Sequence, residues 1–111
     1  MNRDEFARNL AAGTYELIVL DVLRSGPNYG YGIVRRIFEQ SKDTIRWREG
    51  TLYPVLYRLE KRGLLSSEWK GPKAGRQCRY YRLTVRGQRL CREQREQWRT
   101  FSRAVNGLLG L

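Results

Sequence analysis

The feature of this chain that most constrains its fold is a helical repeat that leads directly into two strand-like stretches separated by a basic turn. Residues 49–62 carry apolar side chains at helical spacing, and Gly63 follows them as a stop signal. Residues 64–69 and 78–83 are strand-like, and residues 70–76 between them contain glycine, proline and three cations, which predicts a loop. The apolar positions of the repeat are Leu52, Val55, Leu56 and Leu59. The pattern predicts an amphipathic helix followed by a β-hairpin.

Two further helices are predicted upstream. Residues 14–23 are apolar on nearly every side, which predicts a well-buried helix ended by the Ser-Gly-Pro-Asn stretch at residues 25–28. Residues 31–40 carry an apolar stripe at spacings of three and four and predict a second helix, with Gly30 and Gly32 at its entry. Together with the helix above, these segments predict a three-helix body beside the hairpin.

Two local expectations concern the start of the third helix. Residues 43–47 alternate between polar and apolar side chains and are expected to be extended. Pro54 is expected in the first helical turn, because a missing N–H costs little there.

A long helix is predicted after the hairpin. Thr84 has the character of an N-cap, and residues 85–109 contain no proline. Apolar residues follow one face of this helix at spacings resembling a coiled-coil seam, with Trp98 among them. The monomer has little left to cover that face, so dimerisation is expected. The expected dimerisation residues are Leu90, Phe101, Val105 and Leu108.

These elements predict a mainly α fold with a small β-hairpin wing. A chain of 111 residues fits one domain. Residues 1–83 are expected to form a winged helix-turn-helix, and residues 84–111 a C-terminal dimerisation helix that belongs to the same structural unit.

The net charge indicates a polyanionic partner. It is +11, from 22 lysines and arginines against 11 aspartates and glutamates. Each phosphate that a cation neutralises releases counterions, which favours binding. Arginine outnumbers lysine eighteen to four, and guanidinium makes bidentate contacts with phosphate and guanine edges. For a winged helix, this charge predicts binding to duplex DNA.

Composition also argues against several classes of protein. Histidine is absent, which removes the commonest general base and metal ligand, so no enzyme activity, cofactor or bound metal is expected. Cys78 and Cys91 fit neither a zinc pattern nor a disulfide framework. Without a signal peptide or an apolar spanning run, the chain is expected in the cytoplasm with both thiols reduced, and a redox role for either stays open.

The candidate DNA-binding residues lie on the outward face of the third helix and on the wing. Hydroxyls and cations on the helix suit phosphate oxygens and base edges, with an ordinary solvated face as the alternative. Cations at a hairpin tip, which no core requires, suit phosphates. On the helix the candidates are Arg48, Thr51, Tyr53, Tyr57 and Lys61. On the wing they are Lys70, Lys73, Arg76 and Arg79.

Four motifs in register resemble the PadR family of bacterial transcriptional regulators, in particular its short type with a single C-terminal helix. The resemblance implies a homodimer in which the C-terminal helices form the interface and pack on the partner's N-terminal helix. It also implies repression of promoters with roughly palindromic sites, whose half-sites lie about one duplex turn apart. Gly32 departs from the family, which commonly has an acidic residue there. The motifs are residues 28–33 (Asn-Tyr-Gly-Tyr-Gly-Ile), 50–54 (Gly-Thr-Leu-Tyr-Pro), 58–69 (Arg-Leu-Glu-Lys-Arg-Gly-Leu-Leu-Ser-Ser-Glu-Trp) and 79–84 (Arg-Tyr-Tyr-Arg-Leu-Thr) with Gly87.

The chain is also similar to the multidrug-sensing repressors of this family. In those proteins a tryptophan of the C-terminal helix stacks on planar aromatic, often cationic, ligands at the dimer centre, and Trp98 falls at that position. The resemblance implies a ligand site at Trp98, with a packed interface aromatic as the alternative. Acidic residues that would favour a cation are Glu16, Glu93 and Glu96. The arginines expected on the opposite face of the helix are Arg92, Arg95, Arg99 and Arg103.

Two other classes of function stay open. A winged helix also serves as an RNA-binding or protein-interaction module without ligand sensing, and Tyr80 and Tyr81 are candidates for stacking on unpaired bases. Strand alternation predicts that Tyr81 points inward and Tyr80 outward. An enzyme is the third class, against which the missing histidine argues.

Overall fold

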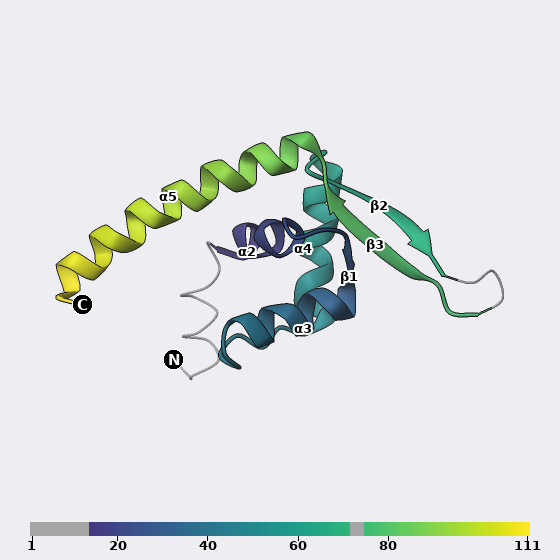
Figure 1. Cartoon of the computed structure of the whole chain (residues 1–111), viewed down its shortest axis with the longest axis horizontal. Helices are drawn as coiled ribbons and strands as arrows, with labels where there is room; N and C mark the ends of the chain where they lie inside the picture. Colours follow the sequence, from purple (N-terminus) through teal and green to yellow (C-terminus); the bar gives the residue numbers. More distant parts are fainter. Residues whose placement is uncertain (1–13, 72–74) are drawn as a thin grey trace.

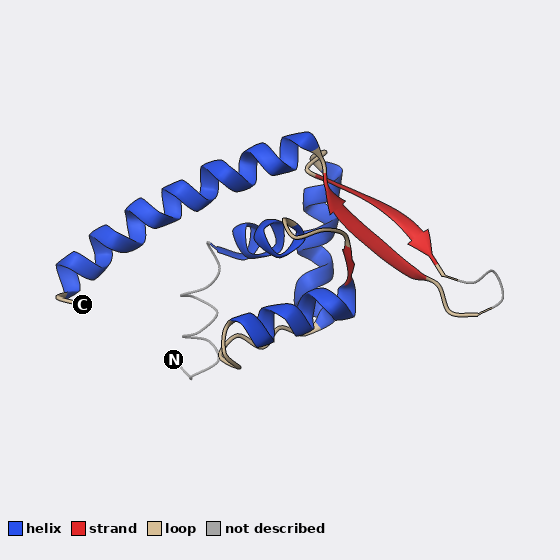
Figure 2. Ribbon diagram, in the orientation of Figure 1, coloured by secondary structure: helices blue, strands red, loops and turns tan. Residues whose placement is uncertain are grey.

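The computed structural model describes residues 14–71 and 75–111, which form four helices and a three-stranded antiparallel sheet. A body of three helices carries a projecting hairpin on one side and a long helix on the other (Figures 1 and 2). The predicted mainly α fold with a β-hairpin wing is confirmed. The helices of the body are α2 (Tyr15–Leu23), α3 (Gly30–Gln40) and α4 (Glu49–Lys61). The remaining elements are β1 (Asn28–Tyr29), β2 (Leu65–Lys70), β3 (Cys78–Leu83) and α5 (Val85–Leu109).

The predicted apolar stripes of the three helices pack against one another and form the core of the body. Helix α2 buries residues on several sides, and α3 contributes Ile33 and Ile37. Helix α4 buries the whole predicted stripe: Leu52, Val55, Leu56 and Leu59. Removing these side chains from water is the main stabilising contribution, at about 25 cal/mol per Å² of apolar surface. The three predicted helices are therefore confirmed by the burial of the residues that predicted them.

The segment before α4 differs from the prediction. Residues 44–48 form no strand, and the turn before them contains Lys42 and Asp43 at φ values of 53° and 64°. Trp47 then inserts into the core, where its ring centroid lies 4.6 Å from that of Tyr15. The expectation of an extended stretch is wrong at Asp43, which has a positive φ, and Trp47 anchors the rest of the segment to the body.

Pro54 also lies elsewhere than expected. It is the sixth residue of α4 rather than part of the first turn, so the Gly50 carbonyl receives no N–H from it. Gly50 is exposed, and nothing lies within 4 Å of the position its Cβ would take. Because Gly50 is exposed, water can satisfy the carbonyl that this proline leaves without a donor.

The sheet contains one strand that the sequence did not predict. Strands β2 and β3 pair antiparallel from Leu65↔Leu83 to Lys70↔Cys78. The unpredicted strand β1 adds Asn28 and Tyr29 to the other edge of β3. The predicted alternation on β3 holds: Tyr81 is buried in the core, whereas Tyr80 packs on Tyr29 with ring centroids 5.3 Å apart.

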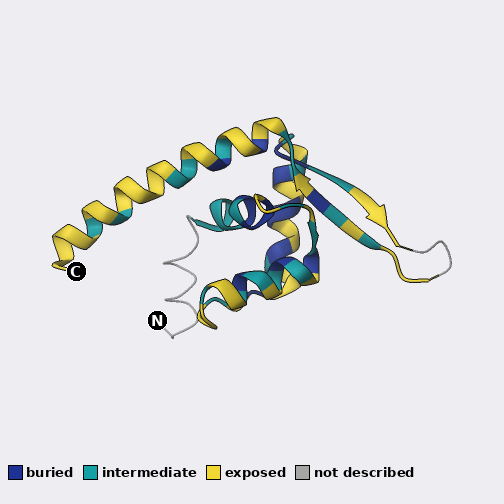
Figure 3. Ribbon diagram, viewed as in Figure 1, coloured by how far each residue is buried: buried dark blue, intermediate teal, exposed yellow. Residues whose placement is uncertain are grey.

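Helix α5 begins at a tight junction with the end of α4. The Thr84 hydroxyl accepts a hydrogen bond from the Gly87 N–H at 3.1 Å and donates one to the Gly63 carbonyl at 2.7 Å. The predicted N-cap is confirmed. A Cβ on Gly87 would lie 2.0 Å from the Leu64 carbonyl oxygen, so this approach requires glycine. Beyond its first turns α5 becomes mostly exposed (Figure 3).

Replacing Gly87 with alanine tests this junction. The new methyl group would collide with backbone, so we expect the free energy of unfolding to fall by about 1–3 kcal/mol. Gly107→Ala is the matched control on the same helix, because nothing lies within 4 Å there and alanine favours helix by up to about 1 kcal/mol. Urea denaturation midpoints measure both, and equal effects would contradict the close approach at Gly87.

Candidate nucleic-acid interface

A cleft of about 930 Å³ separates the first turns of α3 and α4 from the wing, which we define as β2, β3 and the turn between them. The two walls carry different chemistry. The body contributes tyrosine hydroxyls and the N-terminal ends of two helices, whereas the wing contributes arginines. Its lining consists of Tyr29, Gly30, Tyr31, Glu49, Tyr53, Trp69, Arg76, Gln77, Cys78, Arg79 and Tyr81.

The predicted residues of α4 share an exposed surface next to this cleft. Tyr53, Tyr57 and Lys61 follow one another at one-turn intervals, and Tyr57 is 65% exposed. Lys61 lies over the Tyr57 ring, with its Nζ 5.8 Å from the centroid. Arg48 is exposed at the N-cap, whereas Thr51 is half-buried. The helix therefore presents hydroxyls and cations together, as recognition of phosphates and base edges requires.

Tyr53 joins this surface to the entry of α3. A Cβ on Gly30 would lie 2.6 Å from its hydroxyl oxygen, so the ring packs where a side chain would otherwise stand. Burial, with a smaller contribution from Glu49, raises the pKa of Tyr53. The hydroxyl therefore remains protonated near neutral pH and available as a hydrogen-bond donor.

The wing cations differ in how far they are already engaged. Arg76 is exposed and makes no hydrogen bond or ion pair with any other described residue. Lys70 lies 3.5 Å from Glu68. Arg79 bonds to Glu60 of α4 at 3.2 Å, so its predicted phosphate contact competes with a bond inside the protein. Lys73 lies outside the described residues.

Two exposed aromatic residues of the cleft, Tyr31 and Trp69, were not predicted from the sequence. Tyr31 at the start of α3 and Trp69 near the end of β2 are both exposed. Tyr31 stands between two glycines, and Trp69 precedes the basic turn on a strand that otherwise carries polar outward residues. These positions were the available signals, because large exposed aromatic residues beside cations are typical of binding surfaces.

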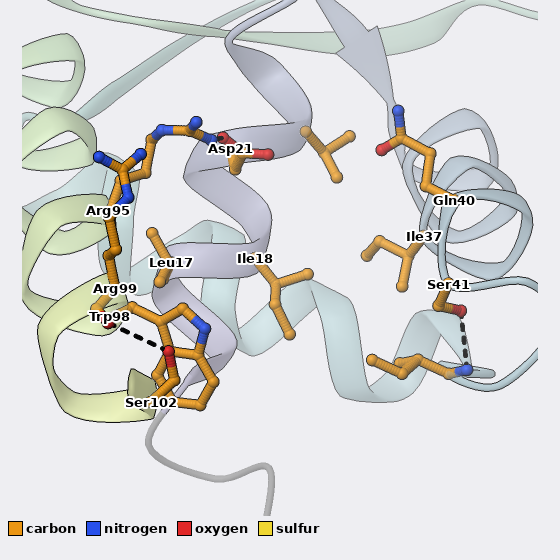
Figure 4. A pocket seen from close by; sticks show the side chains of 12 residues that line it. Leu17, Ile18, Asp21, Ile37, Gln40, Ser41, Arg95, Trp98, Arg99 and Ser102 are labelled. Carbon is orange, nitrogen blue, oxygen red and sulfur yellow. Dashed lines mark hydrogen bonds and ion pairs between the residues drawn. The ribbon is translucent and has the colours of Figure 1, made fainter. Parts of the chain in front are cut away.

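A second hollow of about 490 Å³ lies between α2, α3 and α5 (Figure 4). Trp98 lines it and is 47% exposed, with its ring 6.2 Å from that of Phe101. Arg95 bonds to Asp21 of α2 across the groove. The complete lining is Leu17, Ile18, Asp21, Val22, Ile37, Gln40, Ser41, Ile45, Arg95, Trp98, Arg99 and Ser102.

The charges around Trp98 differ from the prediction. Arg95 and Arg99 line the same groove as Trp98 instead of the opposite face, because residues three and four apart on a helix are neighbours. Glu16 bonds to Arg62 at 2.9 Å and does not line the groove. Glu96 pairs with Arg99 at 3.1 Å.

The predicted dimerisation residues fall into two groups. Leu90 packs against the core of its own chain. Phe101 and Leu108 are exposed, Leu108 to 88%, and Val105 is half-buried. The outer half of α5 therefore presents an apolar face, exposed at Phe101 and Leu108 and half-buried at Val105, and Leu90 is not part of it.

Two absences hold for residues 14–71 and 75–111. No three or more cysteine, aspartate or glutamate side chains there gather into a metal-binding group. No helix in these ranges combines the length and hydropathy needed to cross a membrane.

Comparison with known proteins identifies the family. The sequence model of the transcriptional regulator PadR-like family matches residues 19–93. The transcriptional regulator Rv3488 of Mycobacterium tuberculosis is 42% identical over 69 residues, which cover 62% of this chain and 64% of that protein. The chain belongs to the PadR-like family of transcriptional regulators, which confirms the resemblance.

Solved structures agree with this assignment. The crystal structure of a PadR family transcriptional regulator from Eggerthella lenta has a TM-score of 0.80 and 37% identity, covering 96% of this chain and 90% of that one. Bacillus subtilis PadR in complex with operator DNA has a TM-score of 0.65 and 22% identity, covering 71% of this chain and 45% of that one. The second likeness shows the fold alone.

The two cysteines provide a test of the cleft. Cys78 lines it and is half-buried, whereas Cys91 is buried, which raises the pKa of its thiol. The reactive species is the thiolate, so at about pH 8 iodoacetamide should alkylate Cys78 and spare Cys91 until the protein unfolds. Peptide mass spectrometry with a Cys78→Ser control measures this. Alkylation of Cys91 at the rate of Cys78 in the folded protein would contradict the burial of Cys91.

Proposed function

We propose that this protein is a homodimeric repressor that binds duplex DNA, with α4 in the major groove and the wing on the adjacent backbone. The observation that supports this most directly is the cleft itself, whose two walls bring hydroxyls of α4 and cations of the wing to one surface. A net charge of +11 adds the long-range attraction that steers such a surface to phosphate. Binding in the cytoplasm would block a promoter by occlusion.

The wing and α4 have different roles in this proposal. Arg76 is exposed on the wing and has no hydrogen-bond or ion-pair partner among the described residues, so it is available to neutralise phosphate without regard to sequence. Thr51 and Tyr57 of α4 carry hydroxyls on a helix, the element that enters a major groove and reads base edges. Affinity then comes largely from the wing, and sequence preference from the helix.

Dimerisation through α5 supplies the second half-site. Phe101 and Leu108 leave apolar surface in water that a partner helix would cover, as a coiled-coil seam does. In this proposal residues 1–83 contact DNA and residues 84–111 form the interface. Two-fold symmetry then requires a roughly palindromic operator with half-sites about one duplex turn apart.

Substitutions on the two walls should have different consequences. Arg76→Ala should weaken binding to all duplexes alike and reduce the salt slope of the binding constant by about one. Thr51→Val and Tyr57→Phe should mainly change sequence preference. Fluorescence anisotropy with a duplex selected by the wild-type protein from a random pool, and with a scrambled duplex, measures both at several salt concentrations.

Two results would count against this proposal. If the wild-type protein selects no duplex and binds all with equal, steep salt dependence, sequence-specific regulation fails. If Arg76→Ala and Tyr57→Phe lose specificity equally, the division between wing and helix fails.

Relief of repression by a ligand is the finer part of the proposal. Trp98 beside an apolar groove suits a planar aromatic molecule, whose binding would change the separation of the two α4 helices across the dimer. The charged residues of the lining, Asp21, Arg95 and Arg99, sum to one positive charge. We therefore propose a neutral or anionic aromatic ligand in place of the cation implied by the family resemblance.

Tryptophan fluorescence tests the ligand. Naphthoate should quench the wild-type protein and weaken its binding to the selected duplex, whereas Trp98→Phe should lose both responses. A planar aromatic cation of similar size is the comparison, and it should bind more weakly because of Arg99. No quenching and no change in affinity at saturating concentrations of either compound would remove the ligand from the proposal.

An RNA-binding function has less support from the geometry. The sequence made Tyr80 and Tyr81 candidates for stacking on unpaired bases. Tyr81 is buried, and Tyr80 already packs against Tyr29 with Lys70 over its ring at 5.3 Å. Neither ring presents a free face to a base, so duplex DNA is the better partner.

A further inference from the structure

We propose that Glu60 is a positioning residue that fixes the wing against α4 by holding Arg79. This inference rests on the proposed DNA binding and deepens it. It assigns Arg79 to a link within the protein instead of a phosphate contact. It also gives the single acidic side chain in the second half of α4 a role in a surface that otherwise attracts phosphate.

Three side chains from three elements close a small network. The Arg79 Nη2 of β3 donates to Glu60 Oε1 of α4 at 3.2 Å. The Arg79 Nε donates to the Ser67 hydroxyl of β2 at 2.8 Å, and that hydroxyl donates in turn to Glu60 Oε2. Among the described residues, no other side-chain hydrogen bond joins α4 to the wing.

The surroundings restrict Arg79 further. Its guanidinium carbon lies 5.9 Å from the centroid of the Trp69 ring and 5.8 Å from that of Tyr81. Attraction between a cation and aromatic rings therefore acts on the same group that holds Glu60. The side chains of Glu60 and Arg79 are 29% and 43% exposed, so solvent screens this network only in part.

The position of the network gives it a function. The wing projects from the body (Figure 1), and the strand residues next to its turn are mostly exposed (Figure 3). A link from the middle and outer part of its strands to α4 sets the angle at which Arg76 reaches the DNA backbone while α4 occupies a groove. Loss of the link should therefore reduce binding to the correct duplex, which needs both contacts at once, more than binding to a scrambled one.

Electrostatics alone predicts the opposite result, which makes a sharp experiment. Glu60→Gln removes one negative charge, as does the matched control Glu68→Gln, whose carboxylate pairs with Lys70 and with no other described side chain. We expect Glu60→Gln to weaken binding to a duplex selected by the wild-type protein about threefold to thirtyfold, although the protein becomes more basic. Glu68→Gln should leave it unchanged or slightly tighter.

A charge exchange distinguishes a link from a phosphate contact. The double variant Glu60→Arg, Arg79→Glu keeps the net charge, and the Ser67 hydroxyl can still accept from one partner and donate to the other. The link predicts that this variant recovers affinity to within about threefold of wild type, while Arg79→Glu alone does not. A direct phosphate contact predicts that the exchanged variant stays well outside this threefold range, because position 79 then carries no cation although the net charge is that of the wild type.

Anisotropy at several salt concentrations, with thermal unfolding as a check on folding, completes the test. If the exchanged variant does not fold, a double-mutant cycle of Glu60→Gln and Arg79→Gln replaces it, and additive losses would overturn the link. Unchanged or tighter binding by Glu60→Gln would also overturn it. A wild-type protein that selects no duplex would instead overturn the proposed DNA binding, so the two failures are distinguishable.

Discussion

The hydrogen bonds of one threonine hydroxyl connect the elements on which function depends. Thr84 donates to the carbonyl of Gly63, where α4 ends, and accepts from the N–H of Gly87, where α5 begins. Gly63 turns with a φ of +77°, and the absence of a side chain at Gly87 admits the Leu64 carbonyl. The end of α4, the base of the wing and the start of α5 therefore meet within a few residues. A shift at this point would move the proposed DNA surface and the proposed interface together.

Charge acts in this protein through its distribution more than through its total. Several arginines are engaged inside the chain: Arg62 with Glu16, Arg95 with Asp21, and Arg79 with Glu60. These pairs join elements far apart in sequence. Because their side chains are partly buried, solvent screens the attraction between them less than it would at a fully exposed site. Beside the cleft, Arg76 makes no hydrogen bond or ion pair with another described residue, and it is the wing cation that we propose meets phosphate. A surface of this kind combines long-range attraction with a defined local geometry.

Features set by local periodicity were predictable, and those set by pairing across the fold were not. Apolar spacing and the cap at Thr84 predicted α5 to the residue, because both act within a few residues of sequence. Strand β1 was missed because the two residues Asn28–Tyr29 are held by β3, which lies far along the chain. Sequence likewise gave the charge of Arg79 and Arg95 but not their partners. The candidate site was predicted in composition, whereas its division into free and engaged cations required the structure.

Amide hydrogen exchange with and without a bound duplex would test the central claim, that one surface made of α4 and the wing meets DNA. The duplex should be one that the wild-type protein selects from a random pool. The account predicts added protection in the first half of α4 and on both sides of the wing tip, around Trp69 and Arg76, with none on the outer sheet face around Arg82. Protection confined to α5 or to the outer face of the sheet would contradict it, because the duplex would then bind a surface that the cleft does not include.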